Sequence, residues 1–169
     1  PNLGKSINII EDLKVLYQLI KIIRGFKPDI VHTHMAKAGA LGRIANLLSF
    51  TKAKSIHTFH GHLLFGYFSG FKLFLYIFAE KILNRITDYS IVVGSRVRDE
   101  LISRRIISSN NSIAVPPGLT PGKIPSRLSS RFKLRIQEKD FVLIWIGRLE
   151  KIKRPERLLR ISKELSKYH

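Results

Sequence analysis

Four histidines are the residues of this chain best suited to do chemistry. They lie in or just after two short apolar segments, as His32, His34, His60 and His62. The first two are two residues apart, a spacing that places both side chains on one face of a strand. The other two flank Gly61, directly after the apolar segment 53–59. Because neighbouring parallel strands end at one edge of a sheet, where ligands bind, we expect the imidazoles to form a polar site there.

A metal centre is the main alternative for such a cluster. Zinc requires three or four convergent ligands, usually with a thiolate or carboxylate among them. The chain has no cysteine, and neither histidine segment contains an acidic residue. A metal is therefore not expected. Ser-His-Asp catalysis is not expected either, because the chain has no Gly-x-Ser-x-Gly motif.

Basic residues form a second group with chemical potential. The apolar run 141–146 predicts a strand buried on both faces, and it ends at Gly147 and Arg148, with Lys153 one loop later. Two cations at the end of a strand suit a phosphate or diphosphate group. Lys37 occupies a similar place, at the start of the helix that follows the first histidine segment.

An aromatic stretch follows the second histidine segment. Its loop residues Phe65, Tyr67 and Phe68, together with Lys72, could contact a membrane interface that carries anionic head groups. Packing in the core is the alternative interpretation for residues of this type.

The charge of the chain favours an anionic partner. Its 169 residues include 30 Lys and Arg against 12 Asp and Glu, a net charge of +18. A nucleic-acid-binding domain and a non-catalytic membrane-surface module therefore remain alternatives, although no nucleic-acid recognition motif is present, so no specific nucleic acid is expected. No window approaches the roughly 20 apolar residues that cross a bilayer, and the absence of cysteine fits a reducing compartment.

Strand and helix patterns alternate along the chain, which predicts an α/β protein with a parallel sheet flanked by helices. Strands are expected at 30–34, 53–59, 89–93 and 112–115, and helices at 10–25, 37–50, 71–85 and 97–105. In the first helix, one face is expected to pack through Leu13, Leu16, Leu19, Ile20 and Ile23. The segment 119–139 has the composition of a connection, so that 1–118 and 140–169 would belong to different units.

Four segments together resemble the family 4 glycosyltransferases, retaining enzymes with two facing Rossmann-like domains (the GT-B fold). They are residues 27–39, 57–62, 113–118 and 146–153, in the order of the family. The resemblance covers essentially the whole chain. It implies that 1–118 is most of the N-terminal, acceptor-side domain without its first strand, that 119–139 is the interdomain linker, and that 140–169 is the first β-α unit of the donor-binding domain.

The resemblance also implies roles for individual residues. Gly147, Arg148 and Lys153 would bind the diphosphate of a nucleotide-sugar donor, expected to be UDP-linked. His60 would be the catalytic-site histidine near the transferred sugar. The cleft on the acceptor side would be lined by His34, Lys37, Gly61 and His62. Such enzymes use no metal and no cofactor besides the donor.

Within the family, the resemblance is closest to members that build bacterial cell-surface polysaccharides and lipid-linked glycans. It implies a glycan or lipid-linked acceptor and a cytoplasmic location, peripheral at the inner face of the membrane. The resemblance implies that the family's glycine-rich first loop lies before Pro1 and that the donor-binding Glu-x7-Glu element lies well beyond His169. The chain alone is therefore expected to be a fragment that does not complete a catalytic cycle.

Overall fold

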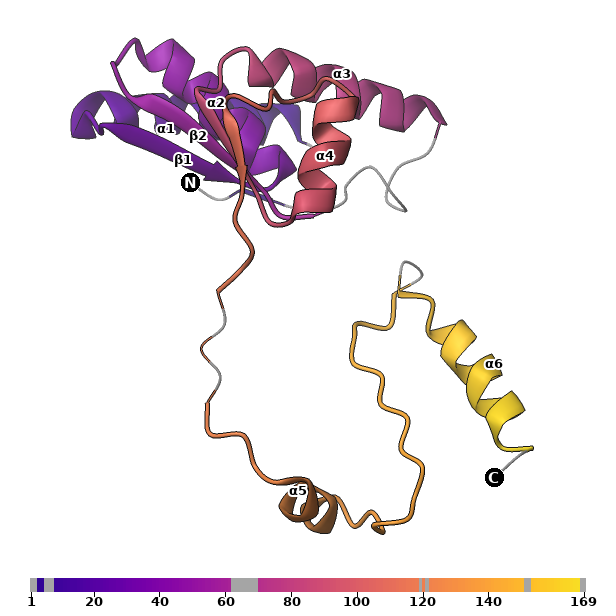
Figure 1. Cartoon of the computed structure of the whole chain (residues 1–169). Coiled ribbons are helices and arrows are strands. Elements are labelled where there is room, and N and C mark those ends of the chain that lie inside the picture. Colours follow the sequence, from indigo (N-terminus) through magenta and orange to yellow (C-terminus); the bar gives the residue numbers. More distant parts are fainter. Residues whose placement is uncertain are drawn as a thin grey trace. The chain divides into compact units, whose positions relative to one another are not determined.

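The structure of the chain is a computed structural model, and it describes residues 3–4, 8–61, 70–118, 120, 122–150 and 153–167. The chain divides into two compact units, Pro1–Pro117 and Gly118–His169 (Figure 1). Each unit is described by itself below.

The first unit confirms the predicted α/β class. It contains a sheet of four parallel strands in the order β1-β2-β3-β4, the same order as in the sequence. Its elements are α1 (Ile9–Phe26), β1 (Ile30–His34), α2 (Ala36–Ser49), β2 (Lys54–Phe59), α3 (Gly70–Asn84), β3 (Tyr89–Val92), α4 (Ser95–Ser103) and β4 (Ser112–Ala114). These bounds lie close to those that the sequence pattern predicts.

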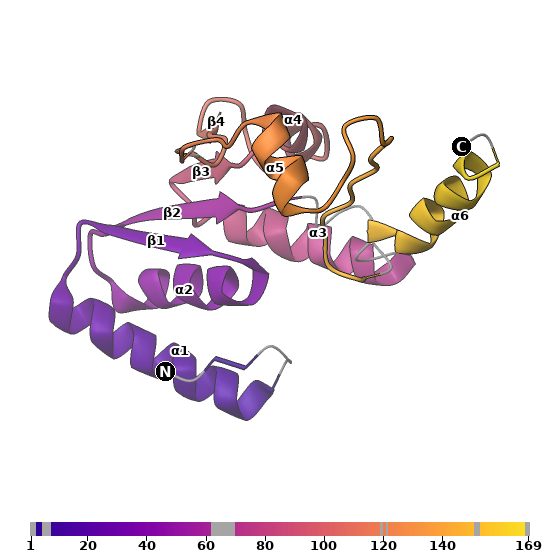
Figure 2. The ribbon, with the colours of Figure 1, turned by 90° about the horizontal axis from the view of Figure 1, so that it is seen from below.

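The helices after β1, β2 and β3 pack on one face of the sheet. Right-handed crossovers between strands that follow one another in the sheet place all connecting helices on the same side. Figure 2 shows α2 and α3 on one side of β1 and β2. On this side Phe59 and Val92 pack with Val97 and Leu101 of α4 in the hydrophobic core. The other face of β1, which carries His32 and His34, is exposed.

The packing side of α1 agrees with the prediction at Leu16, Leu19, Ile20 and Ile23, which are partly or fully buried, and differs from it at Leu13 and Val15. Leu13 is 59% exposed, whereas Val15 and Ile23 are buried. The reason is that α1 packs mainly against α2. A single helix neighbour covers only a narrow stripe of side chains four residues apart, here Val15, Leu19 and Ile23.

The second unit contains α5 (Arg127–Lys133) and α6 (Pro155–Leu165). The prediction of a buried strand over 141–146 is wrong: the segment pairs with no neighbouring strand, and Ile146 is 92% exposed. A strand is buried only where neighbouring strands satisfy its backbone groups and helices cover both faces. The described residues between 118 and 167 include no other strand that could pair with this segment.

Candidate functional site

The strand register brings the histidines of the two segments together. In the parallel pair of β1 and β2, His32 lies opposite Ile56 and His34 opposite Thr58. His34 Nδ1 lies 2.8 Å from His60 Nε2, and His32 Nε2 lies 2.7 Å from Thr58 Oγ1. The rings of His32 and His34 are 4.3 Å apart between centroids, and those of His34 and His60 are 5.0 Å apart. We call His32, His34 and His60 the imidazole cluster.

The imidazole cluster is open to solvent at the carboxyl ends of β1 and β2. His32, His34 and His60 are all exposed. Burial of its ring, followed by the neighbouring His34 and His60, lowers the pKa of His32. A neutral imidazole offers one N–H donor and one acceptor nitrogen, which suits hydroxyl groups. The cluster can therefore hydrogen-bond a polyol ligand at this edge of the sheet.

The backbone turns immediately after the cluster. Gly61 has a φ of +155°, a conformation that side-chain-bearing residues rarely adopt. His62, which the sequence places in the same site, lies outside the described residues.

His57 faces the opposite side of the sheet from the imidazole cluster. It is only 2% exposed, its Nδ1 lies 2.9 Å from Thr33 Oγ1, and its ring meets Phe59 edge-on at 4.6 Å. Burial, with a smaller effect from Arg43, lowers its pKa to about 3. His57 is thus a neutral packing residue between β2 and α2.

Acid is expected to destabilise the first unit through His57. The pKa of His57 is about 3 in the folded state, against the ordinary histidine value of 6.5 in the unfolded state. The unfolded state therefore binds more protons between these two values, and stability falls as the pH drops below 6.5, by up to about 1.4 kcal/mol per pH unit. Denaturant midpoints measured between pH 7.5 and pH 4 check this.

The matched control for the acid effect is His57→Asn, which keeps a polar group near Thr33 but does not titrate. The variant should lose stability less steeply than the wild type over the same pH range. Equal slopes for the two proteins would contradict the assignment.

Lys37 is held by α1. Its Nζ lies 2.6 Å from Asp12 Oδ1 and donates to the carbonyl oxygen of Gly4 at 3.1 Å. Only 22% of its side chain is exposed. The carboxylate of Asp12 offsets the charge that the sequence assigns to anion binding.

The structure contains a buried ion pair between α2 and α3 that the sequence did not predict. Arg43 Nη2 donates to both carboxylate oxygens of Glu80, at 3.3 and 3.0 Å, and Arg43 Nε donates to the carbonyl oxygen of Gly39. The two side chains are 0% and 3% exposed. The sequence offered no signal for this pair, because 37 residues separate its members and charged residues abound. It fixes α3, which follows His60 and Gly61 in the chain, against α2.

The outer side of α3 is apolar and exposed. Its exposed large side chains repeat at helical spacing: Phe71, Phe74, Leu75, Phe78 and Ile82. The rings of Phe74 and Phe78 are stacked at 6.4 Å. Lys72, Lys81 and Arg85 on the same element and its end are also exposed. We call these apolar and basic residues the α3 surface. Phe65, Tyr67 and Phe68 lie outside the described residues.

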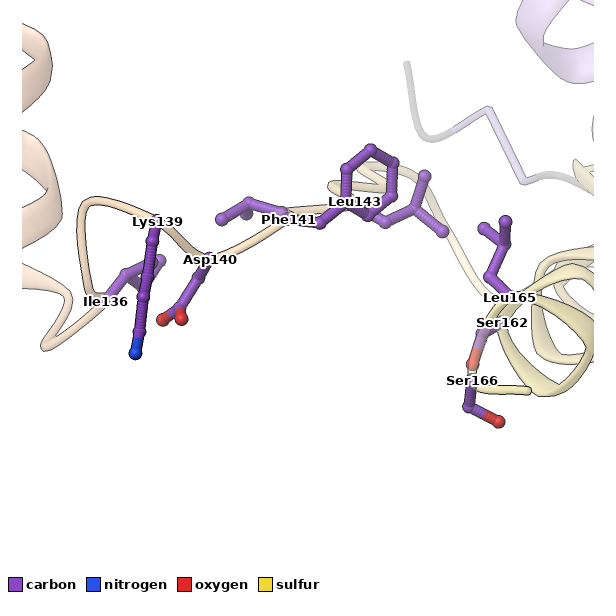
Figure 3. A pocket seen from close by; sticks show the side chains of 9 residues that line it. Ile136, Lys139, Asp140, Phe141, Leu143, Ser162, Leu165 and Ser166 are labelled. Atoms are coloured by element: carbon purple, nitrogen blue, oxygen red, sulfur yellow. The ribbon is translucent and has the colours of Figure 1, made fainter. Parts of the chain in front are cut away.

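Two hollows do not form an evident catalytic site. A cavity of about 340 Å³ between α1, β1 and α2 is lined mostly by apolar residues and also by His32, Thr33 and His34. A hollow of about 760 Å³ in the second unit lies between the segment 136–143 and α6. Figure 3 shows Lys139 and Asp140 on one side of it and Ser162 and Leu165 on the other.

The candidate diphosphate-binding residues lie outside this larger hollow. Arg148 Nη1 lies 3.0 Å from Glu150 Oε1, and the Arg148 side chain is 72% exposed. Lys153 is exposed, and its backbone N–H donates to the carbonyl oxygen of Glu150 at 2.9 Å. In the loop that precedes α6, the Glu150 carboxylate thus pairs with the Arg148 guanidinium, and the Glu150 carbonyl oxygen accepts from the Lys153 backbone. Gly147 is exposed as well.

The described residues contain no group of three or more His, Cys, Asp or Glu placed to hold a metal ion. Among the helices within the same described ranges, none has the length and apolar character that crossing a membrane requires.

The first unit is thus a parallel α/β domain whose imidazole cluster lies at the carboxyl ends of β1 and β2, the sheet edge where proteins of this class bind ligands. The model of Glycosyltransferase Family 4 matches residues 4–123. The chain therefore belongs to glycosyltransferase family 4, as the motifs predict.

A curated relative agrees with this membership, and a solved structure shares the fold. The chain is 31% identical over 167 residues to the UDP-Gal:alpha-D-GlcNAc-diphosphoundecaprenol alpha-1,3-galactosyltransferase of Escherichia coli. That match covers 92% of this chain and 41% of the relative, so the chain spans about two fifths of its length. A glycosyltransferase from Rickettsia africae ESF-5 has a similar fold, with a TM-score of 0.55 at 20% identity over 82% of this chain and 36% of that chain.

Proposed function

We propose that this chain is the acceptor-side domain, with the opening of the donor domain, of a retaining glycosyltransferase. The reaction transfers a sugar from a nucleotide-sugar donor, UDP-linked, to a lipid-linked or cell-surface glycan. The observation that carries the proposal is the contact between His34 and His60 at the ends of β1 and β2, inside the family-matched residues 4–123. The E. coli relative, whose name specifies a UDP-sugar and a lipid diphosphate acceptor, supports the choice of substrates.

His60 has the chemistry to act next to the transferred sugar. Its exposed ring can hydrogen-bond a sugar hydroxyl, and the cluster around it contributes further donors and acceptors. We assign His60 the catalytic position, and His34, Gly61 and His62 the lining of the acceptor-side cleft. The pairing of Lys37 with Asp12 gives it a supporting role at the start of α2.

We assign Arg148 and Lys153 to the donor diphosphate. Gly147, which precedes Arg148 at the end of the apolar segment, belongs to the same assignment. As the glycosidic bond breaks, negative charge accumulates on the leaving diphosphate, and cations placed beside it lower the barrier. The exposure of both side chains agrees with binding a ligand from solution. No metal and no cofactor besides the donor is part of the proposal.

The α3 surface supports a peripheral location at the inner face of the cytoplasmic membrane. Exposed Phe and Leu side chains on one side of a helix insert into an interface, and flanking Lys and Arg attract anionic head groups. Such contact would bring the enzyme to a lipid-linked acceptor. Phe65, Tyr67, Phe68 and Lys72 extend the same assignment along the chain.

The test is a sugar-transfer assay on the protein encoded by the longest reading frame that contains this chain. Radiolabelled UDP-sugars and a polyprenyl-diphosphate-linked sugar are the substrates. His60→Ala and Arg148→Ala should each lower kcat/KM by about 100-fold or more, because each removes an interaction with the charge that develops in the transition state. Arg157→Ala changes an exposed cation on α6 and serves as the matched control, with activity unchanged.

Transfer at the wild-type rate by His60→Ala would overturn the assigned role of His60. Failure of every nucleotide sugar to donate, in a folded protein, would overturn the proposed function itself.

A further inference from the structure

We propose that His34 is a positioning residue for His60: it holds the His60 ring through Nε2 and leaves Nδ1 as the nitrogen that meets the substrate. This inference deepens the proposed function, on which its catalytic meaning rests. The geometric part concerns only the imidazole cluster.

The argument begins with which nitrogens are already in use. His34 Nδ1 and His60 Nε2 are 2.8 Å apart, which is hydrogen-bond distance. When both rings are neutral, exactly one of these two nitrogens carries the proton that they share. In either arrangement Nε2 of His60 is engaged, and its Nδ1 remains to donate to or accept from a substrate hydroxyl.

His60 needs such a support because it lies past the end of β2. The paired residues of β2 end at Phe59, and Gly61 turns the chain at a φ of +155°. His34, by contrast, is fixed in the ladder opposite Thr58. A strand residue thus holds the ring of a residue whose own backbone is outside the sheet.

The rest of the cluster holds His34 in turn. The His32 ring lies against His34 with centroids 4.3 Å apart, and its Nε2 is 2.7 Å from Thr58 Oγ1. Thr58 is 5% exposed and belongs to β2. The contacts therefore run from β2 through His32 and His34 of β1 and back to His60 at the end of β2.

Protonation acts on this arrangement in a defined way. One added proton leaves an imidazolium that donates to a neutral ring, whereas a second places two N–H donors face to face and breaks the contact. The ring of His32 lies beside that of His34 on β1, whereas His57 lies on the opposite face of the sheet. NMR measurements of the pair therefore belong above pH 7.5.

The test is long-range ¹H–¹⁵N NMR of the imidazole rings in the ¹⁵N-labelled chain at pH 8. In the wild type, the ¹⁵N shifts of His60 should report one dominant tautomer. His34→Ala should shift them by several ppm toward the mixture of tautomers of a free imidazole. His34→Asn should restore the wild-type shifts in part, because the Asn amide reaches the place of His34 Nδ1. Ile30→Ala, on the same face of β1, is the control and should change nothing.

Unchanged His60 shifts in His34→Ala would overturn the proposal. Should that variant not fold, His34→Leu compared with His34→Asn makes the same distinction, and equal His60 shifts in these two would overturn it as well.

Transfer kinetics then separate this inference from the proposed function. In the full-length enzyme, His34→Ala should lower kcat by about 10- to 100-fold with little change in the KM of the donor, as misplaced catalytic groups do, and His34→Asn should recover part of it. If His60 holds one tautomer but the protein transfers no sugar, the positioning of His60 by His34 stands and the proposed glycosyltransferase function is overturned. Wild-type kcat in His34→Ala would overturn the catalytic part of the inference.

Discussion

Replacing Arg43 with Met is expected to lower the free energy of unfolding by about 3–5 kcal/mol, because it leaves the buried carboxylate of Glu80 without its partner. Both side chains are almost completely inaccessible, at 0% and 3% exposure, and Arg43 Nη2 contacts both carboxylate oxygens. Urea denaturation followed by far-UV circular dichroism measures the loss.

The pH dependence of the Arg43→Met variant provides a second signature. Burial raises the pKa of Glu80, and Arg43 opposes that shift. Without Arg43 the folded state should hold a proton on Glu80 more tightly than the unfolded state does. The loss of stability should therefore shrink as the pH falls, because protonation removes the unpaired charge.

Two controls separate a broken pair from a general packing defect. The double variant Arg43→Met with Glu80→Leu removes both charges and should recover most of the stability, since apolar replacements of a buried pair are commonly neutral or better. Lys54→Met breaks the exposed pair of Lys54 and Asp88, whose side chains are 70% and 42% exposed, and should cost at most about 1 kcal/mol. An Arg43→Met variant as stable as the wild type would contradict the prediction.

Gly39→Ala is expected to destabilise the first unit by about 1–3 kcal/mol, because α2 lies too close to His57 for a methyl group. A Cβ built on Gly39 would lie 2.4 Å from Cε1 and 2.9 Å from Nδ1 of His57. His57 is buried and held by Thr33, so the ring has little room to move. The change is measured as the difference in unfolding free energy in denaturant.

Gly25→Ala is the matched control, since Gly25 lies in α1 with open space where its Cβ would be. It should be neutral or slightly stabilising, as alanine favours helix. A double-mutant cycle with His57→Ala should show that the penalty of Gly39→Ala falls when the ring is absent. Additive effects of the two changes would show that the close approach is not the cause.

Local sequence pattern predicted the elements of the first unit. Alternating strand and helix segments, with turn residues between them, gave the four parallel strands and their helices within a few residues. The two-residue spacing of His32 and His34 correctly placed them on one face, where their rings are in contact. These features depend on neighbouring residues alone, so a single sequence contains them.

Pairing decided what the pattern could not. The apolar run 141–146 has the composition of a buried strand, yet it has no partner strand in the described residues of its unit and is mostly exposed. The composition of a segment shows that it could be buried in a sheet. Only a neighbouring strand can supply the hydrogen-bond partners that its backbone N–H and C=O groups require.

The sequence by itself determined the family, the parallel α/β architecture and the presence of histidines at one edge of the sheet. The tertiary structure alone decided that Nε2 of His60 meets His34, that His57 is buried beneath Gly39, and that Arg43 pairs with Glu80. The physical reason is distance along the chain, because these contacts join residues that lie 18 to 37 positions apart in different elements. Their energies depend on strand register and burial, which exist only after the chain has folded.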